Sequence, residues 1–214
     1  MSETYRLLGA QRSSASYRVR IALHLKGIDF AEIFVDLAGG AQAQAAYLAI
    51  NAQGLVPTLI CPDGTHLSQS LAIIDYLEEI HREPALLPDD AKGRARVRSL
   101  AQIVACDMHP VNNMRVRNHV RNLLPHDAHA VSGWMAKWSA AGFAALESRL
   151  EEEPETGHFC HGDTPGLADI CLVPQVYNAQ VTGFDMSSYP RVCAIAAACD
   201  TIVAFRNAHP DAIG

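Results

Sequence analysis

The stretch Arg12-Ser13-Ser14-Ala15-Ser16-Tyr17-Arg18-Val19-Arg20-Ile21-Ala22-Leu23 decides how the first part of this chain folds. It opens with hydroxyl side chains and continues as a helix with Val19, Ala22 and Leu23 on one face. The apolar segment 5–8 before it is typical of a short strand. The serines therefore stand where a strand turns into a helix, and the unpaired N–H groups of a helix start favour an anion. The alternative interpretation is that they only cap the helix.

The composition describes a globular protein with a weakly acidic balance. The 214 residues carry a net charge of −6 and no basic run, which does not favour nucleic-acid binding. No apolar run is long enough to span a bilayer, and the N-terminus lacks the pattern of a signal peptide. The six cysteines form no C-x-x-C pair and have no zinc-ligand spacing with histidine, so we expect no metal site. Unpaired cysteines favour a cytoplasmic location.

The hydrophobic pattern changes near residue 82. Before that point strand and helix patterns alternate: strands at 5–8, 31–35, 58–61 and 65–67, and helices at 14–26, 41–50 and 70–79. Residues 83–90, with two prolines, have the composition of a linker. After it only helices are expected, at 91–122 with a kink at Pro110, and at 126–152, 166–182, 189–199 and 202–206. We therefore expect an α/β domain at 1–82, a linker at 83–90 and an all-α domain at 91–214.

Two further segments carry local signals. Leu55-Val56-Pro57-Thr58-Leu59 places a proline directly before a strand, as an ordinary trans residue or as a cis residue of a tight turn. Gln69-Ser70 opens a helix, where the serine can cap the helix or bind a carboxylate together with the free N–H groups. From the residues alone both interpretations of each segment stay open.

The order of these segments resembles the glutathione transferase superfamily. The resemblance is carried by residues 12–23, 55–59 and 69–79 and by Leu172-Val173-Pro174-Gln175-Val176. It is strongest for the zeta class, which includes maleylacetoacetate isomerase, and His109-Pro110-Val111-Asn112-Asn113-Met114-Arg115 is similar to the bacterial maleylpyruvate isomerases of that class. The resemblance implies an α/β thioredoxin-like N-terminal domain, an all-α C-terminal domain, glutathione as the cofactor and a homodimer.

The resemblance also implies which residues form the site. Val56-Pro57 would be cis, so that the backbone before the proline pairs with the cysteinyl part of glutathione. Ser13, or alternatively Ser14, would donate a hydrogen bond to the glutathione thiolate, which a helix start also stabilises. The implied catalytic residues are Arg12, Ser13, Ser14 and Arg115. The implied cofactor-binding residues are Ser13, Ala15, Leu55, Val56, Pro57, Gln69, Ser70, His109 and Asn113.

The implied reaction is addition of the thiolate to a cis double bond conjugated to a carbonyl, rotation, and loss of the thiolate. Arg12 and Arg115 would hold the carboxylates of a maleyl diacid, because a guanidinium binds carboxylate with two parallel bonds. The alternative for Arg115 is a solvated surface arginine, and for His109 a histidine satisfied within its helix. The remaining candidates, Arg18, Arg20, Trp134 and Trp138, are expected to be structural, surface or core residues.

Three departures from the family pattern keep the function open. Ala15 stands where zeta relatives usually have cysteine, the segment around Gln180 lacks an arginine that they commonly carry, and Gly166 replaces a Ser/Thr helix cap. Asp169 should still accept from the cap N–H. We weigh isomerisation of maleylacetoacetate or maleylpyruvate in aromatic catabolism against a glutathione transferase that conjugates electrophiles or dehalogenates α-halo acids. A third possibility is a non-catalytic glutathione-binding module.

Overall fold

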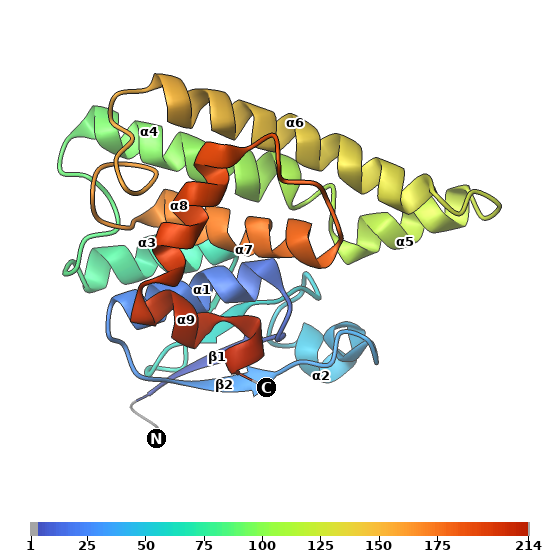
Figure 1. Cartoon of the computed structure of the whole chain (residues 1–214). Helices are drawn as coiled ribbons and strands as arrows, with labels where there is room; N and C mark the ends of the chain where they lie inside the picture. Colours follow the sequence, from blue (N-terminus) through green and yellow to red (C-terminus); the bar gives the residue numbers. More distant parts are fainter. Residues whose placement is uncertain (1–3, 214) are drawn as a thin grey trace. The chain divides into compact units, whose positions relative to one another are not determined.

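The computed structural model describes residues 4–213, which divide into two compact units. The first unit runs to Ala85 and takes up the chain again from Asp200, and the second unit spans Leu86–Cys199. The sequence pattern places the residues after 200 in the helical domain, whereas the structure groups them with the first unit. The reason is tertiary: helix α9 (Val203–Ala208) packs along α1 (Ser14–Leu25), as Figure 1 shows.

The first unit is built on a four-stranded mixed sheet. Its strands are β1 (Tyr5–Gly9), β2 (Phe30–Phe34), β3 (Thr58–Ile60) and β4 (His66–Ser68), in the spatial order β2-β1-β3-β4. β1 and β2 are parallel, so their connection must cross over, and α1 makes that crossover. β3 and β4 pair antiparallel and lead into α3 (Ser70–Ile80). This is the predicted order of elements, with β2 and β4 displaced by one residue.

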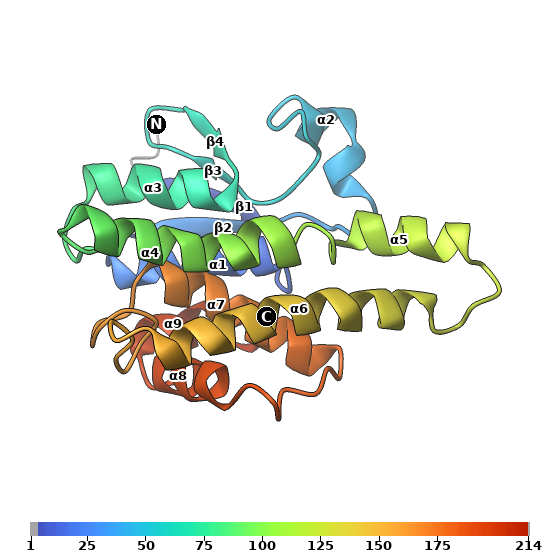
Figure 2. The same cartoon turned by 90° about the horizontal axis from the view of Figure 1, so that it is seen from above.

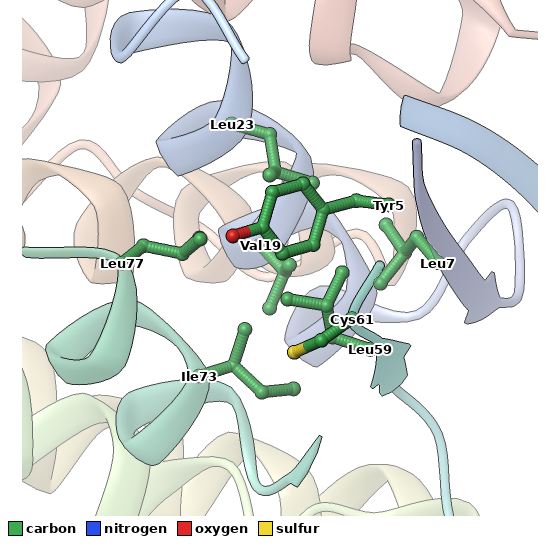
Figure 3. Packing of buried hydrophobic residues seen from close by; sticks show 8 residues of the cluster. All are labelled: Tyr5, Leu7, Val19, Leu23, Leu59, Cys61, Ile73 and Leu77. Carbon is green, nitrogen blue, oxygen red and sulfur yellow. The ribbon is translucent and has the colours of Figure 1, made fainter. Parts of the chain in front are cut away.

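The core of the first unit explains why the stretch 12–23 decides the fold. Figure 3 shows eight buried side chains of this core: Tyr5, Leu7, Val19, Leu23, Leu59, Cys61, Ile73 and Leu77. Val19 and Leu23 lie one turn apart on α1, so both point from the same face of the helix. That face meets the sheet through Leu59 and α3 through Ile73. The predicted apolar stripe of α1 is therefore buried against the sheet, although every other residue from Ser16 to Leu23 is buried as well.

The segment between β2 and β3 differs from the single helix expected at 41–50. It contains a 3₁₀ turn, η1 (Ala41–Ala43), and a short helix, α2 (Ala45–Leu48), separated by an extended residue. Side-chain hydrogen bonds tie this segment to the residues just after it. The Tyr47 hydroxyl donates to the carbonyl of Leu55 at 2.7 Å, and the Asn51 amide donates to the same carbonyl at 2.8 Å. These bonds draw the segment towards β3 and fix the backbone that precedes Pro57.

The second unit is helical throughout the predicted segments. Its helices are α4 (Ala91–Gln102), the π-helix η2 (Ile103–Met108), α5 (Met114–Leu123), α6 (Ala130–Glu152), α7 (Leu167–Val181) and α8 (Pro190–Asp200). Figure 2 shows α5 and α6 running side by side. In the described part of the chain no helix is both long and apolar enough to cross a membrane.

The single helix expected at 91–122 is interrupted. After α4 the chain widens into the π-helix η2, bends at residues 109–113 and restarts as α5. Pro110 lacks the N–H that a continuous helix needs, and Asn113 caps the new helix by accepting from the N–H of Arg115. Met108, the last residue of η2, packs so closely on Gly142 that a β-carbon there would lie 2.2 Å from its side chain. This close packing against α6 holds the chain at the point where the helix breaks.

Asp169 accepts a hydrogen bond from the N–H of the glycine that caps α7, as predicted. Gly166 is the N-cap, and its N–H donates to the carboxylate of Asp169 at 2.9 Å. The second carboxylate oxygen accepts from the N–H of Cys160 at 2.8 Å. Asp169 is almost fully buried, so it joins the preceding loop to the helix in a water-poor interior.

We expect Asp169→Ala to lower the free energy of unfolding by about 2–5 kcal/mol, because two buried N–H groups lose their acceptor. Urea unfolding of the parent and the variant measures this loss. Asp185→Ala is the matched control, since Asp185 accepts from Ser187 N–H at an exposed turn. A loss for Asp169→Ala no larger than that of the control would contradict the expectation.

Candidate active site

The start of α1 carries Ser13 as its N-cap. Ser13 has extended backbone angles (φ −73°, ψ 117°), and its hydroxyl oxygen accepts from the N–H of Ser16 at 3.3 Å. The capping interpretation is therefore confirmed. Because the oxygen is the acceptor in this bond, the hydroxyl proton stays available for donation to an anion at the helix end. Ser14 and Ala15 are half-buried and Arg12 is exposed, so a ligand can reach this helix start.

The loop between β1 and α1 is tightly folded. The N–H of Ala10 donates to the hydroxyl of Ser16 at 3.2 Å, and the N–H of Ser13 donates to the carbonyl of Ala10 at 3.1 Å. A β-carbon on Gly9 would lie 3.1 Å from the Ser16 hydroxyl and 3.3 Å from the Glu32 carboxylate. This close approach leaves little room for any residue but glycine, and it determines the direction in which the loop leaves the strand.

The peptide Val56-Pro57 is cis, as the resemblance implies. Pro57 is buried, whereas Leu55 and Val56 are half-buried. The Leu55 carbonyl is already bound by Tyr47 and Asn51. Within residues 4–213 the backbone N–H and carbonyl of Val56 form no hydrogen bond. An unpaired peptide on a half-buried loop can pair with the backbone of a bound peptide in the manner of an added strand.

The start of α3 places Gln69 and Ser70 in unequal environments. Gln69 is exposed and has φ +70°, and such positive values in residues other than glycine cluster at ligand sites. Ser70 is buried, and its hydroxyl oxygen accepts from Nη1 of Arg18 at 3.2 Å. The N-cap residue Gln69 makes no side-chain hydrogen bond to this helix, so the first N–H groups of α3 receive no cap from it. The helix start therefore offers a carboxylate both N–H groups and the proton of Ser70.

Hydrogen bonds bring the three segments of the first unit together. Arg18 joins α1 to the start of α3 through Ser70. The side-chain amide of Gln69 donates to the carbonyl oxygen of the Gln53 side chain at 2.7 Å, which joins α3 to the loop before Val56. These two hydrogen bonds connect α1 and the loop before Val56 to the start of α3, where Gln69 and Ser70 lie.

Of the structural and surface roles expected for Arg18 and Arg20, the structure shows the structural one: both are buried, with exposed fractions of 2% and 0%. The sequence did not identify their partners. Arg18 contacts Ser70, and Arg20 contacts the loop before Ser13. A usable signal is present in the sequence: residues 17–23 are apolar except for these two arginines, and a helix that is apolar all round is buried.

Three expected site residues lie in the second unit, around its broken helix. His109 follows η2 and is half-buried, with its N–H bonded to the carbonyl of Val104 at 2.9 Å. Asn113 uses its side-chain oxygen to cap α5. Arg115 is exposed, and its guanidinium forms no hydrogen bond or ion pair within the described residues. The positive charge of Arg115 therefore has no ion-pair partner among the described residues, which fits both the carboxylate-binding and the surface interpretation.

The neighbours of these residues on α5 and α6 have mainly structural contacts. Trp134 donates from its indole nitrogen to the carbonyl of Val111 at 2.8 Å, and its ring centroid lies 5.8 Å from that of Trp138. Arg117 is half-buried beside the sulfur of Met135, and burial together with the charge of Arg121 lowers the pKa of Arg117. The tryptophans pack on each other and on the bend but are only half-buried, whereas their spacing favours core positions.

Comparison with known proteins adds family information to this geometry. The model of the glutathione S-transferase N-terminal domain matches residues 12–80, and the model of the C-terminal domain matches residues 128–198. A maleylpyruvate isomerase of Ralstonia sp. is 46% identical over 202 residues, which cover 94% of each chain.

Two solved structures are similar over almost the whole length. One is a holo maleylpyruvate isomerase described as a bacterial zeta-class glutathione S-transferase, with a TM-score of 0.94, 44% identity and 97% of each chain covered. The other is a maleylacetoacetate isomerase of Methylobacterium extorquens with bound malonate and glutathione, with a TM-score of 0.94, 42% identity and 98% of each chain covered. The chain therefore belongs to the glutathione S-transferase family and, within it, to the zeta class.

Proposed function

We propose that this protein is a glutathione-dependent isomerase that converts maleylacetoacetate or maleylpyruvate to the fumaryl product. The observation that carries the proposal is the geometry of Ser13, whose oxygen caps α1 while its proton is left for an anion. The cis peptide before Pro57 and the start of α3 supply the peptide and carboxylate contacts that glutathione needs. The similar isomerases, one of them with glutathione and a diacid, support the same assignment.

The helix start would activate glutathione by favouring its thiolate. A free thiol has a pKa of about 8.5, so only a few per cent is ionised at neutral pH. A helix N-terminus and a hydroxyl donor can lower a thiol pKa to roughly 3.5–7.5. Ser13 is a donor in this role and not a nucleophile, with Ser14 as the alternative.

The reaction balances without any oxidant or net proton transfer. The thiolate adds to one carbon of the cis double bond, and the π electrons move onto the conjugated carbonyl oxygen as an enolate. The former double bond rotates, the enolate collapses, and the thiolate leaves the trans product. Arg12 and Arg115 would hold the carboxylates and stabilise the enolate charge. Each of the two guanidinium groups can serve one carboxylate of the diacid.

The experiment that tests this function follows the maleyl compound and glutathione together. Catalytic amounts of glutathione should suffice, and the maleyl absorbance should disappear while the thiol concentration stays constant. The competing function is a transferase, which uses the same thiolate but leaves glutathione on the product. The lack of an arginine at exposed Gln180 and Val181 instead favours the third possibility, a non-catalytic glutathione-binding module. Consumption of glutathione mole for mole would establish the transferase and reject the isomerase.

Ser70→Ala is expected to weaken glutathione binding about 10- to 100-fold, the range for losing one hydrogen bond to a charged group. Calorimetric titration measures the affinity. Ser148→Ala is the control, because Ser148 is an exposed serine of α6 that bonds Glu152. Equal affinity in parent and Ser70→Ala would remove Ser70 from the cofactor site.

We also propose that the protein is a cytoplasmic homodimer. None of its six cysteines, which all lie within the described residues, forms a disulfide, and this suits a reducing compartment. Large apolar side chains are exposed near the ends of α5, among them Leu123 and Leu124, and an interface would remove such surface from water. Light scattering at micromolar concentration should therefore give twice the mass of 23.2 kDa. A monomer mass would count against the dimer and leave the chemistry untouched.

A further inference from the structure

Arg20 joins three parts of the first unit from a fully buried position. Its Nε donates to the carbonyl of Ala208 at 3.0 Å, its Nη1 to the carboxylate of Glu32 at 2.9 Å and its Nη2 to the carbonyl of Gln11 at 2.9 Å. The guanidinium carbon also lies 5.5 Å from the centre of the Tyr17 ring. One side chain thus binds the C-terminal segment, strand β2 and the loop that precedes Ser13.

The C-terminal segment reaches the same loop by a second route. The side-chain amide of Gln11 donates to the carbonyl of Pro210 at 3.0 Å, across 199 positions in the sequence. His209 contacts the ring of Tyr17 edge-on, with 5.9 Å between ring centroids. The backbone of Gln11 is therefore held by Arg20 of α1, and its side chain by a residue from the other end of the sequence.

Gln11 lies between Ala10 and Ser13, the two loop residues that hydrogen bonds fix near the start of α1. The N–H of Ala10 is bound by Ser16, and the N–H of Ser13 is bound by the carbonyl of Ala10. Gln11 and Arg12 are the part of the loop that these local bonds leave unsupported. Arg20 and Pro210 bind Gln11 and so restrict the path by which the chain enters Ser13.

We propose that Arg20 and the C-terminal segment 208–210 are positioning elements for the thiol-binding loop, which they hold so that Arg12 and Ser13 face the glutathione sulfur. The inference rests on the proposed function, since it assigns a role towards that cofactor. In this proposal Arg20 and segment 208–210 act on the site through Gln11 and not by binding glutathione themselves. The end of the chain thereby contributes to the chemistry at its beginning.

The geometry assigns this role to the planar fork of Arg20 and not to its charge. The charge is paired with Glu32, whereas the contacts with Gln11 and Ala208 go to neutral carbonyl groups. A lysine keeps the charge and can bind Glu32, but a single ammonium on a flexible stem cannot satisfy three partners in different directions. Arg20→Lys therefore removes the hydrogen bonds that position the loop while it keeps the positive charge.

The experiment compares three arginine-to-lysine variants with the parent. Arg20→Lys removes the fork at the loop, and Arg18→Lys alters the other buried arginine of α1, which contacts Ser70. Arg96→Lys is the control for destabilisation alone, because Arg96 holds Cys160 and Thr156 in the second unit. Gln11→Ala removes only the hydrogen bond to Pro210. Because Gln11 is half-buried, we expect this variant to fold.

The readouts are the pKa of bound glutathione from its ultraviolet thiolate absorbance, the glutathione affinity and the melting temperature. Arg20→Lys should raise the thiol pKa by about one unit, which lowers the thiolate fraction about tenfold on the acidic side of the transition. Glutathione affinity should change less than threefold. Gln11→Ala should raise the same pKa by a smaller amount. Arg18→Lys should weaken affinity and leave the pKa in place, and Arg96→Lys should lower only the melting temperature.

The outcomes separate this inference from the function on which it rests. A parent that shows no bound thiolate would overturn both. If the parent does show the bound thiolate, but Arg20→Lys and Gln11→Ala have the same thiol pKa as the parent, only the inference is overturned. Equal pKa shifts in Arg20→Lys and Arg96→Lys would also overturn it, because the effect would then follow from lost stability.

Discussion

Ser13→Ala should raise the pKa of bound glutathione by about one to two units and lower kcat/KM at pH 6 about 10- to 100-fold. The reason is the loss of a hydrogen bond to a charged sulfur, worth about 1.5–3 kcal/mol. The thiolate is the reactive form, so a raised pKa moves the acidic limb of the pH–rate profile to higher pH. Activity should approach that of the parent once the pH exceeds the new pKa. The measurements are the pH dependence of kcat/KM and the ultraviolet absorbance of the bound thiolate.

Two further variants isolate the donor role of Ser13 from its capping role. Ser13→Ala also removes the N-cap bond to Ser16, which costs about 1 kcal/mol of stability. Ser13→Gly loses only a few tenths of a kcal/mol as a cap but has no hydroxyl, so it should be as inactive as the alanine variant. Ser14→Ala should have the smaller effect. If Ser14→Ala shifts the pKa more than Ser13→Ala does, the donor is Ser14.

Arg115→Ala is expected to lower kcat/KM for the maleyl substrate about 10- to 100-fold while glutathione affinity stays within twofold. One charge-assisted contact to a carboxylate is worth about 1.5–3 kcal/mol. The guanidinium is exposed and has no ion pair within residues 4–213, so its removal should leave no buried group unsatisfied. Stability should therefore change by less than about 0.5 kcal/mol. Steady-state kinetics with each substrate varied in turn gives both constants.

Another arginine of α5 supplies the control for Arg115. Arg121 lies on the same helix, is also exposed, and within residues 4–213 its guanidinium donates to the side chain of Asn118. Arg121→Ala removes the same charge from α5 and should leave kcat/KM nearly unchanged. Arg115→Lys should recover part of the activity, because the charge is kept and the bidentate geometry is lost. Equal effects of the two alanine variants would show that only the general positive field of α5 matters.

The sequence by itself determined the elements whose contacts are local or periodic. The stripe of Val19 and Leu23 placed α1 and its buried face, and hydroxyl residues before it marked the N-cap at Ser13. The acid three residues after Gly166 marked the cap of α7. The cis geometry of Val56-Pro57 followed from the family resemblance and not from local preference, because an isolated X–Pro bond favours trans.

Only the tertiary structure decided the features that depend on partners far apart in the chain. The helical pattern of 91–122 contains no local reason for a π-helix, which forms where Met108 packs on Gly142. Helix propensity is a weak preference that such contacts override.

The largest effect of tertiary structure concerns the arginines of α1 and the end of the chain. A charged residue within an apolar run of sequence can be exposed to solvent, or it can be buried with a partner. The sequence around it does not show which of the two occurs. Arg20 is buried because Glu32, Gln11 and Ala208 converge on it from three separate segments. Folding alone brings those acceptors together, and it thereby joins residues 208–210 to the loop of Ser13. Local sequence thus specified the helix start, and long-range hydrogen bonding determined what supports it.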